Sequence, residues 1–122
     1  MSDVPVPIAS YVSLIKYRRS PYYDIAQHFL RELENHYREA GGGSGVFYSL
    51  NPRTFRERIA EKARNSKVTT VNVCRTILAI LYGCKLREGE DFYITTTSGG
   101  RRNYHIKVDG RTLSLLRSFC NV

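Results

Sequence analysis

The chain has 122 residues, a hydrophobic fraction of 42% and a net charge of +8, so it has room for one domain with one core. This composition excludes a chain that is disordered throughout, and no apolar run approaches the roughly 20 residues that span a bilayer. Residues 1–8 carry acidic and proline residues where a signal peptide has a basic and then an apolar segment, so we predict a cytoplasmic protein that does not engage a membrane.

The positive charge is confined to one part of the chain. Residues 1–45 hold five basic and five acidic residues, whereas residues 46–122 hold fourteen basic and six acidic ones. A cationic half joined to a neutral half favours a surface for a polyanion, and we expect nucleic acid to be that partner. The high content of Arg and Tyr, with one Gln and one Met, is typical of a thermophilic source.

Residues 1–19 are expected to form an extended arm ahead of a domain that spans residues 20–122. Within the arm, the apolar residues at 11–15 are compatible with a strand or with one helical turn, and the pattern does not separate the two. The first helix begins at Ser20-Pro21, because Ser caps free amide groups and Pro at the first position needs none. Its apolar face recurs at three- and four-residue steps until Gly41 ends it. The Gly-rich run at 41–45 reads as a flexible linker, either a shortened natural loop or an engineered join.

Two further helices are predicted. Asn51-Pro52 repeats the cap-then-proline signal and starts a helix that runs to about Arg64, with Phe55, Ile59 and Ala63 along one face. A third helix covers about residues 70–82 and ends at Gly83. Its β-branched residues are also compatible with a strand, but the length of the segment and the spacing of its apolar residues favour a helix. Its core stripe consists of Val73, Ile77, Ile80 and Leu81.

A β-hairpin follows, with strands over residues 91–97 and 103–108 and a turn at Ser98-Gly99-Gly100. A turn centred on the two glycines would place Tyr93 opposite Ile106 and Thr95 opposite Tyr104. After a second turn at Asp109-Gly110, the apolar residues at 113–119 form a closing helix or a third strand, and the spacing slightly favours the helix.

The segment from Ile59-Ala60-Glu61 through Ser66 to Thr70-Val71 resembles the helix-turn-helix family, although its turn is one residue longer and lacks the customary glycine. With three helices before a basic hairpin, the chain resembles the winged-helix variant of that family. This resemblance implies an α+β, mostly α fold, in which a three-helix core is followed by a β-hairpin wing and a C-terminal helix. It also implies binding of double-stranded DNA, as in a transcriptional regulator.

Candidate contacts come from the third helix, the hairpin tip and the second helix. A recognition helix buries one face and offers polar or cationic residues on the other, and no acidic residue occurs from 69 to 84. Flexible arginines behind glycines suit phosphates or a minor groove. A solvated helix face and a solvated turn are the alternatives. The candidates are Thr69, Asn72, Arg75 and Thr76 on the third helix, Arg101, Arg102 and Asn103 at the tip, and Arg53, Arg56, Lys62, Lys67 and Lys107 as phosphate contacts.

No catalytic, cofactor or metal motif is visible, so we expect no enzyme. Three cysteines lie in no paired motif; Cys74 is expected as a buried thiol, and a disulfide between Cys84 and Cys120 is left open. His105 is expected to pack across the hairpin. The alternatives to duplex DNA binding are a protein-interaction scaffold and a binder of RNA or single strands, and a homodimer through the first helix or the closing segment is also considered.

Overall fold

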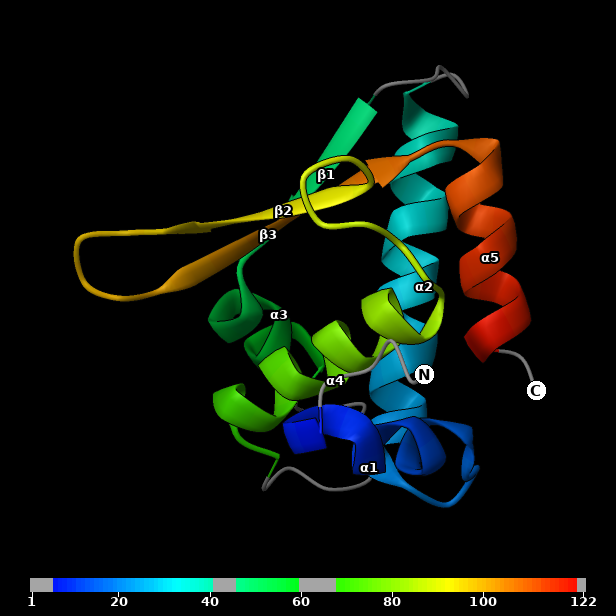
Figure 1. Cartoon of the computed structure of the whole chain (residues 1–122), viewed down its shortest axis with the longest axis vertical. Coiled ribbons are helices and arrows are strands. Elements are labelled where there is room, and N and C mark those ends of the chain that lie inside the picture. The colour runs from blue at the N-terminus through cyan, green and yellow to red at the C-terminus, as the bar shows by residue number, and fades with distance from the viewer. Residues whose placement is uncertain (1–5, 41–45, 60–67, 121–122) are drawn as a thin grey trace.

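Helices dominate this computed structural model, which describes residues 6–40, 46–59 and 68–120 and joins the helices to one three-stranded antiparallel sheet (Figure 1). The expectation of an α+β, mostly α fold is confirmed. The elements in chain order are α1 (Val6–Lys16), α2 (Pro21–Glu39), β1 (Val46–Leu50), α3 (Pro52–Ile59), α4 (Thr70–Gly83), β2 (Phe92–Thr96), β3 (Arg102–Val108) and α5 (Gly110–Cys120). The linker at 41–45 lies outside the described residues.

The prediction of an extended arm is wrong for residues 6–16, which form the eleven-residue helix α1, and residues 1–5 lie outside the described residues. Ile15 on α1 is fully buried, and the helix packs against both α2 and α4. Isolated short helices are marginal in water, so this packing supplies the stability that the local pattern did not reveal.

Both cap-then-proline signals start helices as predicted. Ser20 Oγ accepts a hydrogen bond from the Tyr22 amide at the start of α2. Asn51 Oδ1 accepts bonds from the amides of Arg53 and Thr54 at the start of α3. Phe55 and Ile59 are buried as expected, whereas Ala63 and the predicted end of this helix lie outside the described residues. Side chains that take up free amide groups therefore fix where these helices begin.

Helix α4 agrees closely with its prediction. It begins after Thr69, whose side chain accepts a hydrogen bond from the Asn72 amide, and it runs to Gly83. All four residues of the predicted core stripe are fully buried: Val73, Ile77, Ile80 and Leu81. Tertiary burial thus selected the helix over the strand that the β-branched residues also allowed.

The sheet has the order β1-β3-β2, and β1 is a strand that the sequence analysis did not predict. The hairpin register is one residue away from the prediction: Tyr93 pairs with His105, and Ile94 pairs with Tyr104. The reason is that the turn is longer than one centred on the two glycines. Thr96 pairs with Arg102, and residues 97–101 form the turn between them. Because a one-residue shift exchanges the two faces of a strand, Tyr93 lies on the exposed face.

The closing segment forms helix α5, which the spacing favoured over a third strand. Asp109 caps this helix by accepting a hydrogen bond from the Thr112 amide. Together with α2 and α3, α5 covers the inner face of the sheet, where Tyr104 and Ile106 are fully buried. Cys84 and Cys120 are buried free thiols, so the disulfide left open above is not formed.

Candidate nucleic-acid interface

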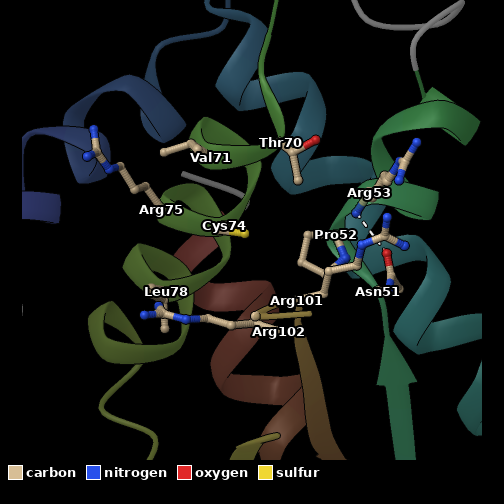
Figure 2. Close-up of a pocket in the computed structure, with 11 residues that line it drawn as sticks. Asn51, Pro52, Arg53, Thr70, Val71, Cys74, Arg75, Leu78, Arg101 and Arg102 are labelled. Atoms are coloured by element: carbon tan, nitrogen blue, oxygen red, sulfur yellow. Dashed lines mark hydrogen bonds between the residues drawn. The ribbon is translucent and has the colours of Figure 1, made fainter. Parts of the chain in front are cut away.

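A groove of about 590 Å³ opens between α4, the start of α3 and the turn of the β2–β3 hairpin (Figure 2). The hairpin projects away from the helices in Figure 1. Residues at its turn form one wall of the groove, and residues of the two helices form the other. Four arginines line it: Arg53 on α3, Arg75 on α4, and Arg101 and Arg102 from the hairpin. None of the described lining residues is acidic.

The starts of two helices border the same groove. Asn51, Pro52 and Arg53 belong to the capped end of α3, and Thr70 and Val71 belong to the first turn of α4. The amino-terminal end of a helix carries a partial positive charge and favours anions. The charged side chains that line the groove are therefore all positive, as are the helix ends beside it.

The arginines around the groove have few acidic neighbours. Arg53 lies 3.7 Å from Glu57, and both side chains are mostly exposed, so water and salt screen this pair. In the part of the chain that the structure describes, Arg75, Arg101 and Arg102 form no ion pair. In Figure 2, Arg101 extends toward Asn51, Arg102 extends toward Leu78, and Arg75 points outward from α4. These three guanidinium groups remain available to an anionic partner.

Helix α1 overturns part of the contact face predicted on α4. Thr76 is fully buried and donates a hydrogen bond to the Asn72 carbonyl, so its assignment as a DNA contact is wrong. The Tyr11 hydroxyl on α1 donates to Asn72 Oδ1 at 2.8 Å, which engages the side-chain amide of this predicted contact. Of the predicted face, Thr69 and Arg75 are exposed, and Thr69 also caps the helix.

Two other residues predicted to contact DNA form hydrogen bonds within the fold instead. Asn103 Oδ1 accepts a hydrogen bond from Asn51 and ties β3 to the start of α3. Arg56 Nε donates to the Val68 carbonyl at 2.6 Å and holds the segment ahead of α4. Lys107 is half-buried on β3 opposite Phe47 and is absent from the groove. Lys62 and Lys67 lie outside the described residues.

The apolar part of the groove was not predicted from the sequence. Val71, Cys74 and Leu78 follow one another along α4 at three- and four-residue steps and line the groove. Val71 is 57% exposed, and with the half-buried Cys74 and Leu78 it forms a continuous apolar strip. This spacing is a signal that could have identified the face, once the opposite side of α4 was known to be covered.

An aromatic cluster lies on the exposed face of the sheet. The rings of Tyr93 and His105 stack with their centres 4.4 Å apart, and Phe47 contacts Tyr93 edge-on at 5.4 Å. The ring nitrogens of His105 hydrogen-bond to the hydroxyl groups of Ser49 and Thr95. His105 therefore packs across the hairpin, as expected. Phe47 and Tyr93 nevertheless remain 38% and 42% exposed.

Among the described residues, no helix has both the length and the apolar character needed to cross a membrane. Within the same ranges, His, Cys, Asp and Glu form no group of three or more that could hold a metal ion. No protein-family model, no curated protein and no solved structure matches the chain, so function must be inferred from the geometry and charge of the groove.

Proposed function

We propose that this chain binds double-stranded DNA through the groove, in a winged-helix arrangement with α4 as the recognition helix and the β2–β3 hairpin as the wing. The observation that carries the proposal is the trio Arg75, Arg101 and Arg102. These residues come from two separate elements, surround one groove and have no acidic partner among the described residues. Cations held without internal partners favour an external polyanion.

The order of the elements supports the winged-helix part of the proposal. Helices α2, α3 and α4 precede the β2–β3 hairpin, and α5 follows it, as the resemblance in the sequence implies. Helix α1 is an addition that covers the Asn72 side of α4 and leaves the Val71 and Arg75 side exposed. Contact with bases would therefore come from this remaining side.

The exposed side of α4 offers two kinds of contact. An apolar side chain such as Val71 suits the methyl group of thymine, and an arginine such as Arg75 suits guanine or a phosphate. Arg101 and Arg102 at the wing suit phosphates or a minor groove. This division predicts affinity that depends mainly on phosphate contacts, with limited discrimination between sequences.

The experiment is a titration of a labelled random duplex, measured by fluorescence anisotropy at several salt concentrations. If the four groove arginines each neutralise one phosphate, the logarithm of affinity should fall with the logarithm of salt at a slope of about −4. Single-stranded DNA and RNA of the same length serve as competitors. Absence of salt-dependent duplex binding would refute the proposal and would favour the protein-interaction scaffold.

The aromatic cluster on the sheet favours a second candidate, which is a single-stranded nucleic acid. Exposed aromatic rings such as Phe47 and Tyr93 can stack on unpaired bases. In that case single strands should outcompete the duplex, and Tyr93→Ala should weaken their binding. If duplex binding dominates and Tyr93→Ala has no effect, the cluster only covers the sheet.

A further inference from the structure

The interior of the groove is apolar, although its rim is cationic. Val71, Cys74 and Leu78 line it as the apolar strip along α4, and Cys74 and Leu78 are half-buried. Pro52, at the start of α3, lines the groove from the opposite side, as Figure 2 shows. Burial raises the pKa of Cys74, so its thiol keeps its proton at neutral pH and the strip carries no charge. Two uncharged surfaces therefore face each other inside the groove.

The size and chemistry of this interior suit only one part of a nucleic acid. Its volume of about 590 Å³ lies within the range of roughly 300–1,000 Å³ that is typical of sites for small organic molecules. A phosphate is a hydrated anion and gains nothing from an apolar wall. The face of a base is apolar, but in a duplex the neighbouring base pairs cover it. Only a base that has left the stack can therefore place its face against the strip.

The arginines are positioned to hold the phosphates of such a nucleotide. Arg53 comes from α3, Arg75 from α4, and Arg101 and Arg102 from the hairpin, so exposed guanidinium groups from three parts of the fold border the apolar interior. In Figure 2, Arg102 extends toward Leu78 at one end of the strip. A guanidinium group in this position can pair with a phosphate or stack on a base. The groove thus offers apolar surface for a base and cations for its phosphates.

We propose that the groove holds one unpaired nucleotide next to a duplex, with its base on the apolar strip and its phosphates on the arginines. The inference rests on the proposed function and narrows its substrate to duplexes that carry an unpaired end or an extruded base. Burial of apolar surface depends little on salt, whereas phosphate contacts weaken as salt rises. The preference for an unpaired nucleotide should therefore persist at high salt, where a blunt duplex binds weakly.

The test compares labelled duplexes by fluorescence anisotropy at low and high salt. One duplex is blunt, one has a short single-stranded overhang, and one has an overhang of the same length made of abasic nucleotides. The abasic overhang is the matched control, because it keeps every phosphate and lacks only the bases. We expect the normal overhang to bind about fivefold more tightly than the abasic one, which is the lower end of what stacking of one base contributes. Overhangs of both polarities are measured.

A substitution in the strip assigns this preference to the groove. Leu78→Gln makes the strip polar with little change in side-chain size, and it should bring the ratio of the two overhang affinities close to one. Leu115→Gln is the control variant, because Leu115 is also half-buried but lies on α5 and does not line the groove. It should keep the fivefold ratio. Melting curves show whether both variants fold, and the abasic comparison on the parent chain needs neither of them.

The possible outcomes separate the inference from the proposed function. Salt-dependent duplex binding with equal affinities for normal and abasic overhangs would overturn the inference and leave the proposed function standing. A ratio that falls in Tyr93→Ala and not in Leu78→Gln would also overturn it, because the base would then lie on the sheet. An isolated strand that binds as tightly as the duplex with the overhang, and depends on Leu78, would support the base site and refute the proposed function. A parent chain that binds no nucleic acid would refute both.

Discussion

The arginines of this chain occupy two different electrostatic settings. Around α2, Arg58 contacts Glu32 with an Nη2–Oε1 distance of 2.8 Å, and Arg117 contacts Glu34 at 2.8 Å. These pairs join α3 and α5 to α2. Around the groove, by contrast, Arg75, Arg101 and Arg102 have no acidic partner among the described residues. The arginines of the first group form ion pairs within the molecule, and those of the second group present their charge to solvent.

This difference shows that net charge alone does not locate a binding surface. The cationic half of the sequence contains both kinds of arginine, since Arg58 and Arg117 belong to it as much as Arg101 does. What separates them is whether the fold brings a carboxylate within a few ångströms. Substitutions in the two groups of arginines should therefore have different effects on nucleic-acid binding.

The largest effect is expected for the wing. The double substitution Arg101→Glu and Arg102→Glu should lower the affinity for duplex DNA about 100-fold, because two charge-assisted contacts worth about 1.5 kcal/mol each are lost. The salt dependence should become shallower by about two units of slope. Both effects are measured by the anisotropy titration.

The chain offers a matched control for this double substitution. Arg18 and Arg19 are also adjacent and exposed, but they lie in the turn between α1 and α2 and do not line the groove. Arg18→Glu with Arg19→Glu changes the net charge by the same amount and should have a much smaller effect. Equal losses in the two double variants would mean that only total charge matters.

A smaller effect is expected on α4. Arg75→Glu should lower duplex affinity at least about tenfold, which corresponds to about 1.4 kcal/mol. Arg75 is exposed and has no described ion pair, so the thermal unfolding curve should not move. If affinity survives, α4 is not a recognition helix and the wing acts without it.

The smallest effect concerns stability in the ion-paired region. Burial, followed by the hydrogen bond and charge of Glu32, raises the pKa of Tyr48 to about 12 from 10.0. A raised pKa means that the folded state holds this proton more tightly than the unfolded state, so the stabilisation is complete below pH 10 and is lost as pH rises toward 12. Tyr48→Phe should make the decline of the urea midpoint over this range less steep. An unchanged decline would show that Tyr48 does not titrate in this way.

The local parts of the fold were predictable from the sequence. The starts of α2 and α3 follow from Ser20-Pro21 and Asn51-Pro52, because a cap and its amide groups lie within a few residues of each other. The core stripe of α4 follows from helical spacing for the same reason. Arg53, Arg75, Arg101 and Arg102 were also named in advance, and the fold brings them to one groove.

Only the tertiary structure decided which polar residues of α4 face solvent. Nothing near Thr76 in the sequence indicates that α1, some sixty residues earlier, covers its side of the helix. The pairing of β1 with β3 likewise depends on contacts between distant segments. Helix caps and helical periodicity involve residues within one or two turns of each other. Burial and access to a partner depend instead on which distant segments pack against a helix. The sequence therefore determined α2, α3, α4 and the cations, and tertiary packing decided which of them form a surface.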